Sequence, residues 1–596
     1  MPPRVDGAGK NGSMASNESG PTPRRDFEVS LTKPSETIDV AEWAGSIPQV
    51  GGTPPHVRVG RRWINLLWSI PIAVVLVVVP VAVAKGLRNM PSVAHFVHRY
   101  PGTIAPNPHP AYLGLPSWLR WQHFFNLFFM AFIIRSGVQI LADHPRLYWT
   151  RHSTPGREWL RFQKPVPPDP MWTAKQDSVK LPGQVGLPGI RHSIGLARWW
   201  HFTFDVLFLL NGAVFYALLF ATPQWQRIVP TTWKVFPSAG SVALQYLSLQ
   251  WPYNHGWVAY NGLQLISYFV TVFVAAPLAL LTGLGQSPAV SNRLTPISHH
   301  LSSQVARSIH FLVLCWFLVF IFMHTAMVWT TGLLTNLNHI TLGNDTSSWA
   351  GFGLYVVWMA IVVAAWIAAT PFTLRHPRVV QRVGATVTGP VQGLFEHIDP
   401  NPRQYTEADI SPHFWLNGRM PDSDEFRRLV DTRFADYRLH VYGLVAHPHD
   451  FTLDELRSMP HQEQITQHFC IQGWSGVAKW GGVPMRDLLA LVEPAADARY
   501  VVFYSFGEGS DGGTYYDVHP LELMYRELSL LALEMNGEPL PVAHGAPIRL
   551  RNEVELGFKQ VKWNRAIEVV AEFRHIGGGH GGYNEDHEFF GYRQAI

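Results

Sequence analysis

The sequence predicts a membrane α-helical bundle of six spans, followed by a soluble α+β domain that is mostly β. Charged residues make up only 15% of the chain, tryptophan occurs 23 times, and long apolar runs are confined to residues 63–372. This composition is typical of polytopic membrane proteins. From about residue 384 onward, charged residues, Pro and Gly return among alternating apolar positions. About 210 residues therefore remain for a soluble domain with its own core.

The two ends of the chain differ in composition from the rest. Residues 1–60 are rich in Gly, Pro, Ser and Thr without apolar periodicity, so we expect a disordered tail. Arg24 and Arg25 resemble a twin-arginine export signal, but residues 28–49 contain no apolar segment of the kind that such a signal requires. A solvated basic pair is the favoured interpretation. Residues 575–596, rich in Gly and His, are expected to form a flexible tail.

Six segments within residues 61–374 are apolar enough to cross a bilayer as helices, which takes about 20 residues each. They are residues 63–84, 118–140, 199–221, 257–283, 309–332 and 351–372. Around these spans, 17 Lys and Arg residues flank the side of the N-terminus and of the loop 141–198, against six on the other side. By the positive-inside rule, we expect an inner (plasma) membrane protein, embedded in lipid, with a cytoplasmic N-terminus and C-terminal domain.

Cysteine content and charge exclude two further classes of protein. The chain has two cysteines, Cys315 in an apolar run and Cys470 in the soluble part, so a disulfide framework is excluded. The net charge of +4 and the lack of a long basic tract argue against nucleic acid as a partner.

Four histidines lie within or at the ends of apolar spans: His123, His201, His310 and His324. A single intramembrane histidine is more often a satisfied core residue, but four in this arrangement favour a functional site. His310 and His324 are 14 residues apart on one helix, so they share a face about 21 Å apart along the axis. The alternating directions of the spans place His201 beside His310 and His123 beside His324. Two His–His pairs at two depths describe two haems, each with two histidine ligands.

An arginine stands three residues before three of these histidines: Arg120, Arg198 and Arg307. Residues at this spacing share a helix face, so the arginines are candidates to pair with haem propionates. Interfacial anchoring by Arg and Trp is the alternative, and it explains the residue types but not the repeated spacing.

Residues 118–332 resemble the di-haem cytochrome b family typified by the gamma subunit of respiratory formate dehydrogenase. The resemblance rests on single histidines in spans two, three and five, with two on the fifth. Spans one and six would be additions to that core. The resemblance implies two haem b groups and a quinone or quinol partner, with no residues assigned to the quinone site.

The soluble domain contains the segment from Ile465 through Cys470 to Leu489, which predicts a strand, a loop that carries Cys470, a Gly-rich turn and a helix. On pattern alone, a lone cysteine beside aromatic residues is most often an inert buried thiol. Several further motifs follow in order: Tyr515-Tyr-Asp-Val-His-Pro520, Leu533-Glu-Met-Asn536-Gly537, His544-Gly-Ala-Pro547-Ile-Arg549 and Gly557-Phe-Lys559-Gln-Val-Lys562.

Together these segments resemble the sulfite oxidase fold family, in the branch that includes the catalytic subunit of the periplasmic methionine sulfoxide reductase. The resemblance covers about 160 residues and implies a molybdenum–molybdopterin cofactor, with the Cys470 thiolate as a metal ligand. Arg549, Lys559 and the backbone at Gly557 become candidate contacts of the pterin phosphate. The weaker candidate contacts of the cofactor are His544, Asn417 and Ser505.

Tyr515 corresponds to a tyrosine that faces the metal in this family, where a phenol can orient or protonate the substrate. A core tyrosine is the alternative for this position, and strand-edge and turn chemistry is the alternative for the candidate cofactor contacts.

The chain departs from the sulfite oxidases at two places. Leu416 occupies the position of an arginine directly before the motif asparagine, and Ile471-Gln472-Gly473 replaces basic residues after the ligand cysteine. An anionic pocket for sulfite loses two expected charges, which favours reduction of a neutral S-oxide or N-oxide.

The sequence therefore predicts a membrane-bound oxidoreductase that couples the quinone pool, through two b haems, to oxygen-atom transfer on a small substrate. The molybdopterin domain is expected over residues 384–574. A sulfite-type dehydrogenase and a non-catalytic redox sensor are the alternatives, and a homodimer is left open.

Overall fold

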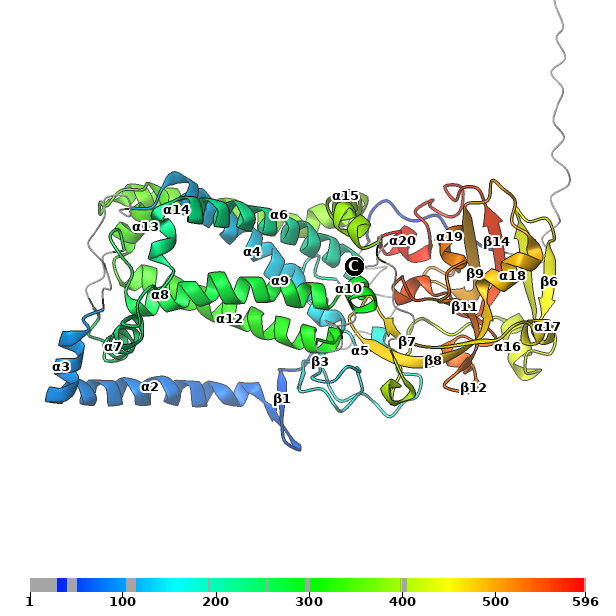
Figure 1. Ribbon diagram of the computed structural model, residues 1–596, viewed down its shortest axis with the longest axis horizontal. Helices are drawn as coiled ribbons and strands as arrows, with labels where there is room; N and C mark the ends of the chain where they lie inside the picture. Colours follow the sequence, from blue (N-terminus) through cyan, green and yellow to red (C-terminus); the bar gives the residue numbers. More distant parts are fainter. Residues whose placement is uncertain are drawn as a thin grey trace, which may run out of the picture.

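The computed structural model describes residues 29–39, 51–102, 114–190, 193–252, 256–294, 298, 301–396, 398 and 405–593. Figure 1 shows an elongated helical bundle with a β-rich domain at one end. Six helices of the described chain are long and apolar enough to cross a membrane. They run over Leu66–Arg88, Ser117–Asp143 (α4), Ile194–Ala221 (α6), Gly262–Gly285, Ser303–Thr330 (α12) and Trp349–Arg375 (α14). The predicted fold class is confirmed, and each predicted span overlaps one of these helices.

The interior of the bundle is formed mainly by α4, α6 and α12 together with the helix over Gly262–Gly285. This helix consists of α8 (Gly262–Phe269), a π-helical turn (Val270–Ala275) and α9 (Ala276–Gly285). The first span, α2 (Ser69–Arg88), lies apart from the others along one side of the bundle (Figure 1), and the residues of its apolar run are largely exposed. An exposed apolar surface of this length is suited to lipid.

Shorter helices cap the far end of the bundle and connect it to the β-rich domain. The far end carries α3 (Pro91–Arg99), α7 (Val235–Leu247) and α13 (Leu333–Thr341). On the other side are α5 (Ala174–Asp177), α10 (Pro288–Arg293) and α15 (Pro377–Glu396). The predicted domain boundary at residue 384 falls inside α15, which packs against α6.

Part of the predicted N-terminal tail is ordered. The hairpin of β1 (His56–Val59) and β2 (Arg62–Asn65) joins β4 (Leu160–Arg161) and β3 (Arg146–Leu147) in a sheet of order β2-β1-β4-β3. Residues 29–39 also have partners, since the Thr514 amide donates to Ser30 O and the Ile38 amide donates to Leu374 O. The prediction of disorder is wrong for these stretches because their partners lie far away in the sequence. Residues 1–28, with Arg24 and Arg25, and residues 40–50 lie outside the described residues.

The β-rich domain contains two five-stranded sheets. The first has the order β10-β9-β14-β5-β6, with β14 and β5 parallel, and the second contains β12-β11-β8-β7 with β13 paired to β11. The strands are β5 (Arg438–Gly443), β6 (His449–Thr452), β7 (Gln462–Phe469), β8 (Ser475–Pro484), β9 (Tyr500–Glu508), β10 (Thr514–Pro520), β11 (Ser529–Met535), β12 (Glu538–Pro539), β13 (Arg549–Asn552) and β14 (Asn564–Val570). The helices of this domain are α16 (Asp424–Asp431), α17 (Leu453–Ser458), α18 (Met485–Val492), α19 (Leu521–Met524) and α20 (Tyr583–His587).

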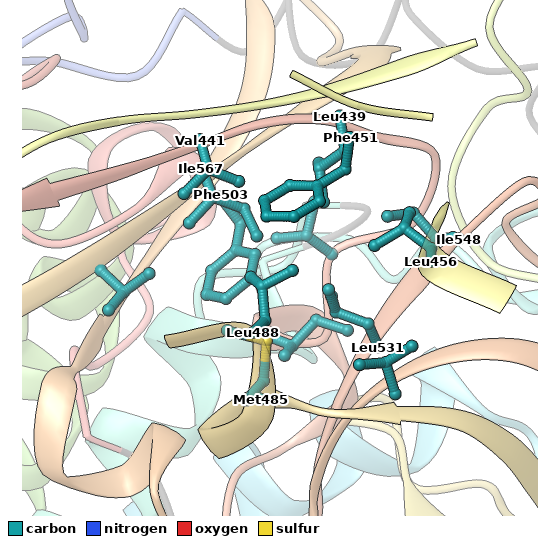
Figure 2. Close-up of a cluster of buried hydrophobic side chains, with 14 of the residues drawn as sticks. Leu439, Val441, Phe451, Leu456, Met485, Leu488, Phe503, Leu531, Ile548 and Ile567 are labelled. Carbon is teal, nitrogen blue, oxygen red and sulfur yellow. The ribbon is translucent and has the colours of Figure 1, made fainter. Parts of the chain in front are cut away.

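Apolar side chains of both sheets and of the adjoining helices meet in one core. Figure 2 shows Val441, Phe503 and Ile567 of the first sheet facing Leu531 of the second and Leu488 of α18. Alternate residues of a strand point to opposite faces, which explains why the apolar positions of these strands repeat every second residue. The expected Gly-rich turn after Cys470 is instead the paired strand β8, whose three glycines, Gly476, Gly481 and Gly482, lie beside its neighbouring strands.

The predicted flexible C-terminal tail is packed between the two parts of the molecule as far as residue 593. Asp586 accepts hydrogen bonds from the amides of Gly578 and His580, and Phe590 is buried. Trp199 of α6 donates its indole N–H to Phe589 O at 2.8 Å. A Gly/His-rich composition predicted disorder, but the segment gains its order from these long-range contacts.

Candidate functional site

A cavity of about 730 Å³ lies where the β-rich domain meets the helical bundle. Its volume is in the range of cofactor and ligand pockets. Seven of the eight cofactor and substrate residues predicted in the soluble domain line it, namely Asn417, Cys470, Ser505, Tyr515, His544, Arg549 and Gly557. The eighth, Lys559, is not among its lining residues.

Cys470 lies at the end of β7, in a tight loop closed by hydrogen bonds from the Cys470 amide to Trp474 O and from the Gly473 amide to Cys470 O. Asn417 donates its side-chain amide to Sγ at 3.4 Å. Burial raises the pKa of the Cys470 thiol to about 12. Without a metal the thiol therefore stays protonated at neutral pH, and binding of a soft metal would release its proton.

Arg549 and Lys562 place two cationic side chains on the same cavity, of which Arg549 is buried and Lys562 is half-buried. Lys562 donates to Asn417 O at 2.6 Å, and Arg549 donates to His544 O at 2.9 Å. Among the described residues neither forms an ion pair, and the Arg549 Nε has no hydrogen-bond partner. Burial lowers the pKa of Lys562, and the nearby Arg549 lowers it further. The pair is therefore suited to a bound anion, which would supply the missing charge.

Lys559 does not reach the cavity. Its side chain is fully buried, and its ammonium lies 2.6 Å from Asp517 and 2.6 Å from Glu585. The Lys559 side chain, expected to contact the phosphate, is therefore engaged in a structural ion pair. Lys562 lines the cavity instead. Sequence reasoning missed Lys562, because two lysines three residues apart in one motif look alike without knowledge of which is paired.

The remaining predicted residues have distinct surroundings. Tyr515 donates to Phe558 O at 2.6 Å and accepts from the Asn584 side chain at 3.0 Å, and burial raises the pKa of its phenol, so it stays neutral. Ser505 donates to Lys562 O at 2.7 Å. A Cβ at Gly557 would lie 2.2 Å from His468 Nε2, so this position requires a glycine beside a second cavity-lining histidine.

The bundle contributes one wall of the cavity, which the sequence did not predict. Asp143 of α4, Ile194 of α6 and Lys175 of α5 line it together with Glu588 of the C-terminal segment. Lys175 and Glu588 form an ion pair at 2.9 Å. Leu416, which replaces the expected arginine, accepts a hydrogen bond at its carbonyl from the Ala174 amide of α5. Leu416 does not line the cavity.

The loop that carries Cys470 is also held by the first turns of α12. Gln304 donates to Gly473 O and to Ser475 Oγ, both at 3.0 Å. Gly473 has φ +100° and lies against Arg307, whose Nε would be 3.3 Å from an added Cβ. A residue with a side chain would be strained in this backbone conformation, so glycine permits the contact.

The four span histidines form the two expected pairs. The ring centroids of His201 and His310 lie 6.5 Å apart, and those of His123 and His324 lie 6.2 Å apart. Two imidazoles that ligate one metal from opposite sides, at about 2.0 Å each, place their centroids roughly 6 Å apart. Both separations therefore fit a shared metal between the rings.

The three arginines near these histidines have separate environments. Arg120 donates to Thr341 O at 2.8 Å, and Arg307 donates to the carbonyls of His144 and Arg146. Arg198 lies over the ring of Phe202 and close enough to Cys470 to interact with it electrostatically. Pairing with haem propionates stays a prediction for all three.

Comparison with known proteins agrees with this geometry. Residues 427–575 match the family model described as the oxidoreductase molybdopterin binding domain, so the β-rich part is a molybdopterin-binding domain of an oxidoreductase. A stretch of 198 residues is 37% identical to the putative protein-methionine-sulfoxide reductase subunit YedZ1 of Azospira oryzae and covers 33% of this chain and 69% of that protein. The chain belongs to the family of this relative.

Two further relatives are catalytic subunits named MsrP. The protein-methionine-sulfoxide reductase catalytic subunit of Ralstonia nicotianae is 28% identical over 34% of this chain and 64% of its own length. The one of Burkholderia mallei is 31% identical over 24% of this chain and 45% of its own length. The crystal structure of the sulfane dehydrogenase SoxCD from Paracoccus pantotrophus is 24% identical over 24% of this chain and 42% of that chain, with a TM-score of 0.22.

Proposed function

We propose that the protein is a membrane-bound molybdenum oxidoreductase that passes electrons from quinol, through two b haems, to a small S-oxide. The observation that carries the proposal is the contact between the Cys470 loop and α12. This helix also carries His310 and His324, so the proposed metal thiolate and two proposed haem ligands belong to one connected piece of structure.

The cavity residues fit a molybdopterin cofactor. Cys470 would supply the soft protein ligand to the metal, and Arg549 with Lys562 would bind the terminal phosphate, since neither cation has an ion-pair partner among the described residues. Asn417 would steady the thiolate by its hydrogen bond to Sγ. Oxygen-atom transfer and two-electron storage are the chemistry that a bound molybdenum centre supplies.

The bundle residues fit two haems. Each histidine pair has the ring separation that a shared iron requires, and the lipid-facing bundle gives access to quinol. One-electron transfer is the chemistry that haem supplies. Reduction of one sulfoxide takes two electrons and two protons and yields a thioether and water. One quinol supplies the electrons, and the protons enter from solvent.

Reduction is favoured over sulfite oxidation by two observations. Leu416 stands in place of an arginine and does not line the cavity. The cavity wall around Lys175 contains the carboxylates of Asp143 and Glu588, which disfavour a dianionic substrate. The relatives named above as methionine-sulfoxide reductase subunits support an S-oxide substrate. An N-oxide is a chemically similar substrate, and a sulfite-type dehydrogenase and a redox sensor are the alternatives.

The N-terminal hairpin, the loop after α4 and the β-rich domain lie on one side of the bundle. This is the side with the excess of Lys and Arg. The positive-inside rule therefore supports a cytoplasmic position for the β-rich domain in a plasma membrane.

Metal analysis and spectroscopy of the full chain purified in detergent test the proposal. About one molybdenum and two b haems per chain are expected, and methionine sulfoxide or dimethyl sulfoxide should reoxidise the reduced haems. Cys470→Ala should keep the haems and lose this reoxidation. Haem reduction by sulfite would favour the dehydrogenase, and no response of the haems to either substrate would favour the sensor.

A further inference from the structure

Two small hydroxyl side chains contact the histidine pair nearest to the Cys470 loop. Ser136 Oγ of α4 lies 3.0 Å from His201 Nδ1, and Thr282 Oγ1 of α9 lies 3.0 Å from His310 Nδ1. Both distances are those of ordinary hydrogen bonds. Neither hydroxyl belongs to the molybdopterin cavity, and their position points to a role at the metal site between the two rings.

The direction of these hydrogen bonds follows from the other partners of each hydroxyl. Ser136 donates its only proton to Phe132 O at 2.7 Å, and Thr282 donates to Leu278 O at 2.7 Å. Each hydroxyl therefore accepts from the histidine. His201 Nδ1 also lies 3.1 Å from Ile133 O, a carbonyl that can only accept.

Both rings thus carry their proton on Nδ1, which leaves Nε2 as the nitrogen for a metal. The nearest carboxylate to His201 Nε2 is that of Asp205, at 3.6 Å, which is too far for a hydrogen bond. The tautomer that a haem ligand requires is therefore already fixed by Ser136 and Thr282.

The other histidine pair has weaker support. His324 Nδ1 lies 3.4 Å from the Tyr268 hydroxyl, at the long limit of a hydrogen bond. In the part of the chain that the structure describes, the His123 ring has no hydrogen-bond partner. The two pairs therefore differ in how strongly the surrounding protein withdraws the Nδ1 proton.

We propose that Ser136 and Thr282 are positioning residues that give the His201–His310 centre a lower reduction potential than the His123–His324 centre. This inference rests on the proposed binding of two haems. A hydrogen bond from Nδ1–H makes imidazole a stronger donor to iron and favours the oxidised form. The lower-potential centre lies on the side of the Cys470 loop, so its lower potential increases the driving force for the step from the bundle to the β-rich domain.

Potentiometric titration of the full chain in detergent tests this, with the haem absorbance as readout. Wild type should show two one-electron waves. His324→Leu, which removes a ligand of the distant centre, should abolish or displace the upper wave and thereby assign the lower wave to His201 and His310. Ser136→Ala and Thr282→Val should each shift the lower wave upward and leave the upper wave in place, while Thr282→Ser should restore the wild-type potential.

Thr222→Val is the matched control. Thr222 donates to Leu218 O at 2.8 Å, the same bond to the preceding turn that Thr282 makes, and the structure places no histidine against it. This variant should move neither wave.

The possible failures are distinguishable. A chain that binds no haem overturns the proposed function itself. Two bound haems whose lower wave is lost in His324→Leu, or whose potentials do not respond to Ser136→Ala and Thr282→Val, overturn this inference and leave the proposed function standing. If both hydroxyl variants lose haem, the order of potentials in wild type and His324→Leu still decides the inference.

Discussion

Lys559→Met should lower the thermal stability of the β-rich domain and leave its molybdenum content unchanged, because the Lys559 side chain lies in a buried ion pair and does not line the cavity. The sequence motif makes Lys559 a contact of the pterin phosphate, but the structure buries its ammonium between Asp517 and Glu585. Burial lowers the pKa of Lys559, the two carboxylates raise it, and the net shift is upward. Lys559→Met would leave two acidic side chains buried without their cation.

The loss of stability in Lys559→Met comes from the two carboxylates that remain buried without their cation. Removal of one partner from a buried ion pair typically costs about 3–5 kcal/mol. For a domain of this size, that corresponds to a fall of roughly 6–20 °C in melting temperature. The pKa values of Asp517 and Glu585 are already raised by burial, and loss of Lys559 raises them further. An acid with a raised pKa becomes neutral by protonation as the pH falls, and a neutral carboxyl needs no cation. The loss of stability in Lys559→Met should therefore be largest at neutral pH and shrink as the pH falls toward 5.

Scanning calorimetry of the full chain in detergent, together with molybdenum analysis, would measure both effects. Lys479→Met is the matched control, because Lys479 also lies near two carboxylates, Glu407 and Glu463, but at the surface, where ion pairs contribute little. An unchanged melting temperature combined with loss of molybdenum from Lys559→Met would refute the structural assignment and restore the phosphate role.

Three further predictions concern the proposed cofactors. Cys470→Ser should lose bound molybdenum and keep both haems, as elemental analysis and the reduced-minus-oxidised spectrum would show; equal molybdenum in the variant would remove Cys470 as a ligand. Arg549→Met and Lys562→Met should each lower the molybdopterin content at least tenfold, because each deletes one of the two cations proposed to bind the phosphate. Full occupancy would contradict the anion site. Gly473→Ala should weaken the contact with Arg307 and slow sulfoxide-dependent haem oxidation severalfold in stopped-flow mixing, with the molybdenum content retained. An unchanged rate would show that electron transfer does not depend on this contact.

The features that could be predicted from sequence are those that depend on residues close together in the chain. Apolar runs of about 20 residues predicted the six helices. The 14-residue spacing of His310 and His324 on one helix predicted that the two histidines lie at different depths in the bundle. The alternation of span directions then selected their partners, and the rings of His201 and His123 lie where this argument places them. Helix geometry is regular enough for spacing alone to predict such neighbours.

The features that the sequence did not show depend on contacts between distant segments. Lys175 pairs with Glu588 across 413 residues, and Trp199 donates to Phe589 O across 390. Neither the order of the C-terminal segment nor the wall that the bundle adds to the cavity has a local signal. The exchange of roles between Lys559 and Lys562 has the same origin, because burial beside Asp517 and Glu585 is a property of the assembled domain.

The bundle and the β-rich domain are parts of one chain, which bears on the proposed electron transfer between them. The relatives of this chain include proteins named as subunits, one as YedZ1 and two as catalytic MsrP. Here the β-rich domain is bound to the bundle by contacts at Gln304, Lys175 and Trp199, spread around the cavity. In the proposed function, electron transfer between the two parts is intramolecular, with an effective concentration set by their linkage in one chain. If the proposed function holds, these contacts should keep the Cys470 loop at the end of α12, and the rate of electron delivery should not depend on protein concentration.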